Sequence, residues 1–96
     1  IKLDLARHSV AIRDQEIYLT TTEFNLLHEF ATHIDQVLLH EQLLTAVWGP
    51  EYRNNVDYLR SYVHSLRKKL ERDPANPEII VNIPGVGYML TEPTLA

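Results

Sequence analysis

The sequence predicts one α+β domain in which an N-terminal antiparallel β platform and a C-terminal β-hairpin flank three helices. Three observations predict it. Apolar and polar residues alternate over about 1–19, apolar residues recur every three or four positions within 20–72, and alternation returns over 79–90. Ninety-six residues with 45% hydrophobic content suit a single domain, which buries roughly two thirds of its unfolded surface.

Composition argues against several classes of protein. The chain has no cysteine, so neither disulfides nor a thiolate zinc site can stabilise it. Nothing resembles a signal peptide, and no apolar run approaches the roughly 18 residues of a membrane span. We therefore expect a soluble cytoplasmic domain with no membrane contact, and we expect neither a metal nor a cofactor.

The N-terminal platform is predicted from three short runs of alternating residues. Their apolar members are Leu3, Leu5, Val10, Ile12, Ile17 and Leu19. Polar residues at Arg7-His8 and Asp14-Gln15 separate the runs, so we expect an antiparallel meander over about 2–19. Neither turn carries the Asn-Gly or Asp-Gly pair that fixes a tight hairpin.

The first helix is predicted to begin at a capping box. In this motif the hydroxyl of Thr20 accepts from the backbone N–H of Glu23, whose carboxylate accepts from the N–H of Thr20 in return. We expect the helix to run to about His33. Its buried side is expected to consist of Phe24, Leu27, Phe30, Ala31 and Ile34.

A second helix is predicted over about 40–47, after a short extended apolar link at 37–39. Its apolar side consists of Leu43, Leu44 and Val47. Their spacing is that of an amphipathic helix. His40 stands at the expected N-cap, where Ser or Thr is more usual, and this weakens that end of the helix.

The connection after this helix is marked by a glycine and a proline. Gly49 suits the left-handed residue just past a helix end, and Pro50 prevents continuation of the helix. Residues 48–55 then form an exposed loop that can meet a partner. We expect Trp48 to join the core or to anchor this loop rather than to stack on bases.

The longest helix is predicted over 56–72, which no proline or glycine interrupts. One stripe is apolar and consists of Val56, Leu59, Val63, Leu66 and Leu70. Polar residues lie away from it: Asp57, Arg60, Ser61, His64, Arg67, Lys68 and Glu71. About 25 Å of helix can pack one face into a core while the other lies in a DNA major groove.

Charge is unevenly distributed along the chain. The formal net charge of −4 argues by itself against a nucleic-acid partner. Residues 56–72 hold five Lys/Arg against Asp57 and Glu71, a local charge of +3, which leaves −7 on the rest. Phosphates interact within a Debye length of roughly 8 Å, so the local charge matters more than the total. The alternative is an ordinary surface helix with solvated charges.

A β-hairpin is predicted over 79–90, after a connection at 73–77 that is rich in helix breakers. Its first strand alternates through Ile79, Val81 and Ile83. Pro84-Gly85 suits the centre of a type II turn, and 87–90 forms the return strand. We expect the tail from Thr91 to be loose.

Three helices closed by a β-hairpin form a winged helix-turn-helix, and four blocks of residues match one family of this fold. The blocks are Leu19-Thr20-x-Thr22-Glu23-Phe24-x-Leu26-Leu27, Gln42-Leu43-Leu44-x-x-Val47-Trp48-Gly49, Val63-x-x-Leu66-Arg67-x-Lys69-Leu70-Glu71 and Gly85-Val86-Gly87-Tyr88. In this order and at these separations, the chain resembles the DNA-binding domain of OmpR/PhoB-family response regulators over nearly its whole length. Residues 48–52 and 58–60 resemble the KdpE branch of that family.

The resemblance implies sequence-specific binding of double-stranded promoter DNA by the effector domain of a two-component response regulator. The helix at about 56–72 is then the recognition helix in the major groove. A receiver domain with a phosphorylated aspartate is absent from this chain, and two protomers bind direct repeats head to tail. RNA polymerase is expected to contact Pro50, Glu51, Tyr52, Arg53 and Asn54.

The chain departs from the family pattern at several positions. Thr21 stands where many relatives have proline, which is harmless for function. Pro84 and Met89 stand at wing positions where basic residues are common. Proline has neither a side-chain donor nor an N–H, so we expect the tip of the wing to act mainly by shape and backbone contacts.

Residues of the long helix divide into expected base contacts and expected backbone contacts. The base-contacting set is Arg60, His64 and Arg67, because arginine can bind guanine through two hydrogen bonds. The alternative is that these side chains contact only phosphate or solvent. The backbone-contacting set is Tyr58, Ser61, Lys68, Lys69 and Arg72. The cations among them also favour the helix C-terminus as dipole partners. The wing set is Pro84, Gly85, Val86, Gly87 and Tyr88.

Two other functions compete with DNA binding. A hydrolytic enzyme needs a nucleophile, a base and an orienting group in a cleft. Ser61, His64 and Asp57 share a helix face, but that face is convex and exposed, so we expect no enzyme. The other alternative is a winged helix that only contacts proteins, with an acidic partner or RNA polymerase on its basic face. Tyr62 is expected to pack rather than to read DNA.

Overall fold

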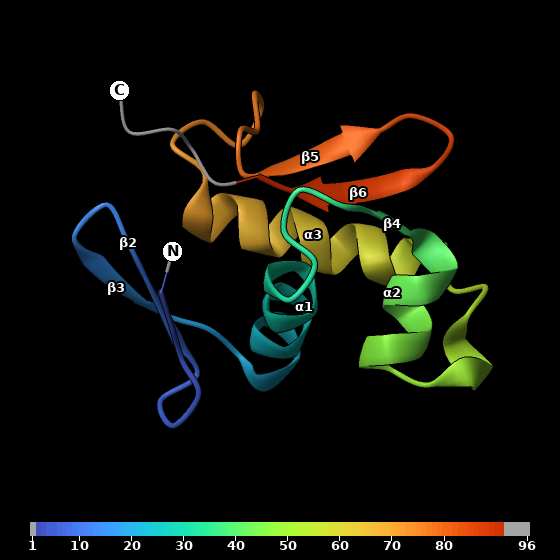
Figure 1. Cartoon of the computed structure of the whole chain (residues 1–96), viewed down its shortest axis with the longest axis horizontal. Coiled ribbons are helices and arrows are strands. Elements are labelled where there is room, and N and C mark those ends of the chain that lie inside the picture. The colour runs from blue at the N-terminus through green and yellow to red at the C-terminus, as the bar shows by residue number, and fades with distance from the viewer. Residues whose placement is uncertain (1, 92–96) are drawn as a thin grey trace.

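The computed structural model describes residues 2–91 and contains two small sheets and three α-helices in that range (Figure 1). In chain order the elements are β1 (Lys2–Asp4), β2 (Ser9–Ile12), β3 (Gln15–Tyr18), α1 (Thr21–Ala31), β4 (Val37–Leu39), α2 (His40–Val47), the 3₁₀ helix η1 (Pro50–Tyr52), α3 (Val56–Leu70), β5 (Ile80–Ile83) and β6 (Gly87–Leu90). This confirms the predicted α+β class. Apart from Thr91, the tail lies outside the described residues.

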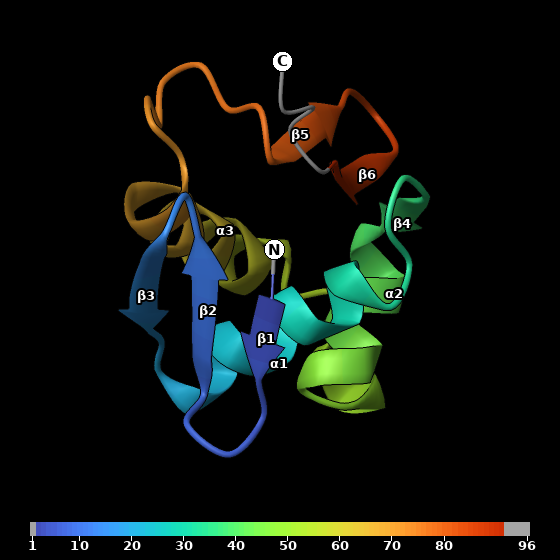
Figure 2. The ribbon, with the colours of Figure 1, turned by 60° about the vertical axis from the view of Figure 1, so that its left-hand side comes forward.

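The platform is the expected antiparallel meander, with strand order β1-β2-β3 (Figure 2). Its second turn differs by one residue from the prediction, because Ile12 pairs with Gln15 and the loop is Arg13-Asp14. Both loop residues have positive φ, 49° and 61°, as in a type I′ turn. Leu5 is 65% exposed, because β1 ends at Asp4, whose carboxylate accepts from the N–H groups that start the next turn.

Helix α1 begins at the predicted capping box. Thr20 Oγ1 accepts from Glu23 N at 3.2 Å, and Glu23 Oε1 accepts from Thr20 N at 2.9 Å. The helix ends at Ala31, two residues earlier than predicted. Ile34 therefore lies in the following turn and is exposed, contrary to the prediction, whereas Leu26 is fully buried.

The segment at 37–39 is a strand of the second sheet, which the prediction as a simple link missed. The sheet has the order β4-β6-β5, so β6 is its central strand. Gly87 lies where β6 meets β4, and a Cβ at this position would come within 2.0 Å of the Leu38 carbonyl oxygen. Only glycine fits there without a shift of the backbone.

Helix α2 has the predicted bounds, but its N-cap is Leu39 rather than His40. The side chain of Gln42 replaces the missing cap, since its Oε1 accepts from Leu39 N at 2.8 Å. Gly49 has a φ of +119° with a ψ of 163°. This is a positive but extended conformation, not the left-handed helical one expected.

The core lies where the three helices meet the second sheet. Its fully buried side chains include Leu26, Leu27, Phe30, Leu43, Leu44, Leu59, Leu66, Leu70, Ile79, Ile80 and Leu90. Each such side chain contributes about 1.5–3 kcal/mol relative to an exposed one. The stripe that anchors α3 was predicted, and it fixes which side of this helix remains open.

Helix α3 ends at Leu70, so Glu71 does not lie on its solvent face as predicted. Glu71 is the C-cap residue, 7% exposed. Its carboxylate accepts the backbone N–H groups of Glu78, Ile79 and Ile80 at 2.8–3.1 Å. Arg13 reaches the same end of α3, where its Nη2 donates to the Leu70 carbonyl at 2.7 Å.

Candidate nucleic-acid interface

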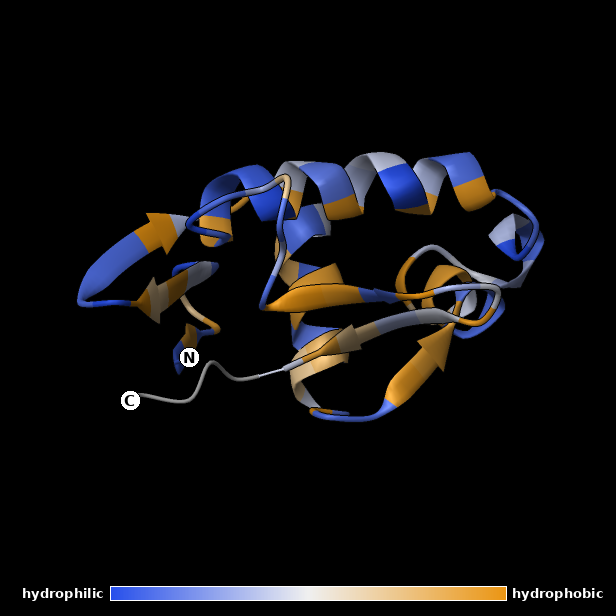
Figure 3. Ribbon diagram, turned by 90° about the horizontal axis from the view of Figure 1, so that it is seen from above, coloured by the Kyte–Doolittle hydropathy of each residue, from blue (hydrophilic) through white to orange (hydrophobic). Residues whose placement is uncertain are grey.

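Helix α3 is the longest helix among the described residues, and one of its faces is polar. Hydrophilic residues follow the outer side of this helix and hydrophobic ones face the rest of the domain (Figure 3). The exposed positions on and beside this face are Asp57, Tyr58, Arg60, Ser61, His64, Lys68, Lys69 and Arg72. An α-helix with one buried stripe and an open polar side has the dimensions that fit a major groove.

Arg60 is fully available on this face. Its Nη1 lies 3.3 Å from Asp57 Oδ1, and the two side chains are 68% and 98% exposed. An ion pair this exposed contributes between about 0 and 1 kcal/mol. A stronger partner for the guanidinium can therefore displace Asp57 at little cost.

Lys68 and Arg72 supply open positive charge further along the chain than Arg60, at and beyond the C-terminal end of α3. Both are exposed, and within residues 2–91 neither lies within 4.0 Å of an acidic oxygen. Arg72 lies beyond the end of α3, which stops at Leu70. His64 and Ser61 are exposed on the same outer side. Ser61, His64 and Lys68 are thus exposed on α3 as expected, whereas Arg72 was expected inside the helix.

Arg67 does not project from the exposed face as predicted, but turns toward the wing. It is half-buried. Its Nε and Nη2 both donate to the carbonyl oxygen of Ile80, at 3.0 and 2.8 Å. Its Cζ lies 5.7 Å from the ring centroid of Tyr88. No sequence pattern predicts these contacts, because the partners lie on two strands, β5 and β6, further along the chain.

Lys69 is also engaged within the domain. Its Nζ donates to Glu23 Oε1, the same oxygen that accepts from Thr20 N–H. Burial acts to raise the pKa of Glu23, but the hydrogen bonds from Lys69 and Thr20 outweigh it and hold the pKa below its usual value. The +3 charge of this segment is therefore less available to a ligand than the sequence suggested.

Aromatic side chains hold the 48–55 loop against the first turns of α3. The ring centroids of Trp48 and Tyr62 are 5.2 Å apart, and those of Tyr52 and Tyr58 are 5.9 Å apart and nearly parallel. Trp48 and Tyr62 pack against the core, as expected for an anchor and a packing residue. Tyr58 is 49% exposed and joins loop and helix.

The wing tip forms the predicted type II turn. Val86 N donates to Ile83 O at 3.0 Å across Pro84 and Gly85, and Gly85 has a φ of +74°. Pro84, Gly85 and Val86 are exposed, whereas Gly87 and Tyr88 are buried. Only the first three of the five predicted wing residues are therefore open to a ligand.

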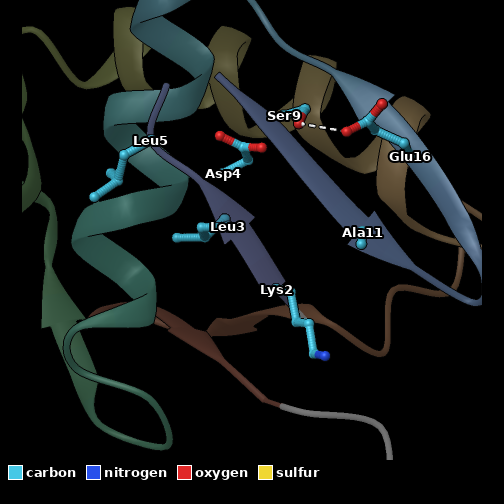
Figure 4. Close-up of a pocket in the computed structure, with 7 residues that line it drawn as sticks. All are labelled: Lys2, Leu3, Asp4, Leu5, Ser9, Ala11 and Glu16. Atoms are coloured by element: carbon cyan, nitrogen blue, oxygen red, sulfur yellow. Dashed lines mark hydrogen bonds between the residues drawn. The ribbon is translucent and has the colours of Figure 1, made fainter. Parts of the chain in front are cut away.

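A shallow hollow of about 390 Å³ lies over the platform (Figure 4). It is lined by Lys2, Leu3, Asp4, Leu5, Ser9, Ala11 and Glu16. Both carboxylates that line it already accept hydrogen bonds within the domain. Asp4 accepts from backbone N–H groups, and Glu16 accepts from Ser9 at 3.2 Å and from Tyr18 at 2.7 Å. The hydrogen bond from Tyr18 is the main cause that lowers the pKa of Glu16.

The alternative sites suggested by polar residues do not assemble. No hydrogen bond joins Ser61, His64 and Asp57 in the described part of the chain. No group of three or more His, Cys, Asp or Glu that could hold a metal ion occurs among the described residues. Within the same range, no helix is long and apolar enough to cross a membrane.

Three helices, a platform, a wing and an exposed basic helix face define a winged-helix domain of the kind found in transcriptional regulators. Residues 14–90 match the family described as "Transcriptional regulatory protein, C terminal". The chain belongs to this family, and its relatives are response regulators of the OmpR/PhoB class. This is not an enzyme family.

The relatives agree with the motif resemblance. The chain is 40% identical over 88 residues to the KDP operon transcriptional regulatory protein KdpE of Escherichia coli (strain K12), covering 92% of this chain and 39% of that protein. The response regulator DrrB of Thermotoga maritima, an OmpR/PhoB homologue, is 33% identical with a TM-score of 0.78, covering 94% of this chain and 41% of DrrB. The RstA DNA-binding domain of Klebsiella pneumoniae, solved in complex with RstA box, is 27% identical with a TM-score of 0.82, covering 93% and 88% of the two chains.

Proposed function

We propose that this domain binds double-stranded DNA sequence-specifically and controls transcription as the effector domain of a two-component response regulator. The observation that carries the proposal is the open polar face of α3, anchored by its buried stripe and flanked by a wing. The family and the DNA complex of the RstA domain support it. Helix α3 then lies in the major groove, where a helix fits.

Within this proposal, the exposed residues of α3 have different tasks. Arg60 lies in the N-terminal half of the helix, the half that contacts base edges in helix-turn-helix docking. His64, one turn further on, is the second base contact. Lys68 and Arg72 lie toward the other end and bind phosphates, with Tyr58 and Ser61 contributing hydroxyl groups to the backbone.

Two variants of α3 test the proposal on a site selected from randomised DNA and on a scrambled duplex. Arg60→Ala is expected to cost about 1–3 kcal/mol on the selected site, little on the scrambled one, and to relax preference at one or two base pairs. Lys68→Ala is expected to weaken both alike and to reduce the slope of log affinity against log salt by about one unit. Salt titrations of both variants on both duplexes measure this.

Two outcomes would contradict the proposal. An affinity that stays flat between low and physiological salt would exclude the basic face of α3 as the binding surface. An equal loss on both duplexes for Arg60→Ala would mean that this arginine holds only phosphate. Asp57→Asn is the matched control for Arg60→Ala, because it removes the same ion pair but leaves the guanidinium of Arg60 in place.

The relatives extend beyond this chain, which covers 39% of KdpE, and the functions of the longer protein are part of the proposal. We infer a receiver domain that joins two protomers on direct repeats of promoter DNA in the cytoplasm, and RNA polymerase contacts at 50–54. Linking two copies of this domain is expected to raise its apparent affinity for a direct repeat through effective concentration. Equal affinities of the linked and single domains would argue against two adjacent sites.

A further inference from the structure

The first residue of β5 is held by two side chains from the last turns of α3. Ile80 N donates to Glu71 Oε2 at 2.8 Å, and Ile80 O accepts from Nε and Nη2 of Arg67. Arg67 lies in the last turn of α3 and Glu71 is its C-cap residue, and both side chains reach the same strand. Both backbone groups of Ile80 are thus satisfied by one helix.

This contact closes part of a sheet edge. Strand β5 is an outer strand in the order β4-β6-β5, and an outer strand has backbone groups without a strand partner. Ile80 is fully buried, so its carbonyl depends on a protein donor rather than on water. Arg67 supplies that donor from α3.

The guanidinium of Arg67 also contacts the central strand of the wing sheet. Its Cζ lies over the ring of Tyr88 on β6, and the ring of Tyr88 meets that of His40, the first residue of α2, at 5.4 Å. Leu38 on β4 pairs with Tyr88. One side chain of α3 therefore touches both strands of the hairpin, at a point where the hairpin is also fixed to α2.

Base reading would require Arg67 to give up these contacts. Bidentate recognition of guanine uses two donors of the guanidinium, and two of its nitrogens already donate to Ile80 O. Arg60, in contrast, has only an exposed ion pair to exchange. The two arginines lie in the same helix, but the guanidinium of Arg67 is held by contacts within the domain, whereas that of Arg60 is exposed.

We propose that Arg67 is a positioning residue that fixes the wing relative to the recognition helix, so that both meet DNA in one geometry. It does not read a base. The DNA part of this inference rests on the proposed function, whereas the coupling of wing and helix is a property of the free protein. Arg67 sets how far apart the two DNA-contacting elements are held.

The first experiment uses the protein without DNA. Arg67→Lys keeps the positive charge but loses the planar pair of donors, and Arg67→Met keeps an unbranched chain without the charge. Both are expected to speed backbone amide exchange of the wing, 80–90, by about ten-fold or more, while exchange in α1 stays unchanged. Lys68→Met, at the next and exposed position, is the matched control and is expected to leave wing exchange unchanged.

The second experiment compares two duplexes of the selected site, one complete and one shortened so that no base pairs lie under the wing. Arg67→Lys is expected to lose about ten-fold in affinity, or 1.4 kcal/mol, on the complete duplex and nothing on the shortened one. Its preferred bases in a selection from randomised DNA are expected to match those of the wild type.

Three results would overturn the inference. One is unchanged wing exchange in both Arg67 variants. Another is a changed base preference for Arg67→Lys, which would make this arginine a reader. The third is an equal loss of affinity on both duplexes. If the wild-type domain bound no DNA, the proposed function would fail, while the exchange experiment would still decide whether Arg67 holds the wing.

Discussion

Lys69 and Glu23 are 46 positions apart in sequence, yet Lys69 Nζ lies 2.5 Å from Glu23 Oε1. The pair joins the last turn of α3 to the first turn of α1, and the same oxygen closes the capping box with Thr20. The Glu23 side chain is only 7% exposed, that of Lys69 37%. One contact thus stabilises a helix start and the docking of the recognition helix.

Lys69→Ala is therefore expected to act on stability more than on DNA binding. It should lower the free energy of unfolding by about 1–2 kcal/mol, because it leaves a buried carboxylate without its cation. The salt slope of DNA binding is expected to stay as in the wild type, unlike in Lys68→Ala. Urea unfolding and salt titration of both variants separate the effects. A salt slope reduced by one in Lys69→Ala would show that Lys69 binds phosphate after all.

The free energy of unfolding is expected to fall at acidic pH because Glu23 becomes protonated. Because its pKa is lowered by folding, the unfolded chain takes up the proton more readily, so the stabilisation is complete above the usual value of 4.5. It is lost as the pH falls through the lowered pKa of the folded state. The difference in unfolding free energy between wild type and Glu23→Gln should shrink over that range. A difference independent of pH would contradict this role.

Glu71→Ala is expected to lower the unfolding free energy by about 2–4 kcal/mol, since it removes the acceptor of three backbone N–H groups, two of them in buried residues. Glu78→Ala is the control. Its side chain is exposed, so its effect should stay within about 0.5 kcal/mol. Similar midpoints of urea unfolding for the two variants would show that water replaces the carboxylate.

Two glycines of the wing are expected to respond differently to alanine. Gly87→Ala places a methyl group within 2.0 Å of Leu38 O, and such overpacking costs about 1–3 kcal/mol or more. Gly85→Ala meets no atom within 4 Å but has a φ of +74°, a conformation that costs about 1–2 kcal/mol. Thermal unfolding gives both values, and only Gly87→Ala should loosen the contact of β4 with β6.

Pro84→Arg is expected to tighten DNA binding by about 1 kcal/mol, because it adds a guanidinium at an exposed tip where a minor groove attracts positive charge. The measurement compares wild type and variant on the complete and shortened duplexes. An unchanged affinity, in a variant that unfolds at the wild-type temperature, would show that the tip stays away from the groove.

Features with a short-range cause could be predicted from the sequence. The Thr20–Glu23 capping box and the turn at Pro84-Gly85 each span four residues, so the signal and the structure occupy the same stretch. The apolar stripe of α3 is likewise a local repeat. Arg60 and Lys68 are exposed, as expected from their positions away from this stripe, and their contacts with DNA stay predictions.

Features that depend on distant partners could not be predicted. The strand at 37–39 is defined by its pairing with β6, some fifty residues later, and its three apolar residues carry no alternation. Arg67 and Lys69 have the composition of DNA contacts, but their partners are a carbonyl on β5 and a carboxylate on α1. The Arg13-Asp14 turn has no Asn-Gly signal, and the contact of Arg13 with Leu70 helps to hold it.

The central place of β6 in the second sheet also bears on how the chain folds as it is made. Residues 87–90 connect β4, from the middle of the chain, to β5, and among the described strands they are synthesised last. Until then β4 and β5 have no neighbour to pair with, although the helices between them are complete. Because chains are synthesised at roughly 5–20 residues per second, β6 is made a few seconds after α1, the helix that it covers. The domain therefore reaches its native packing only after nearly all of it has been synthesised.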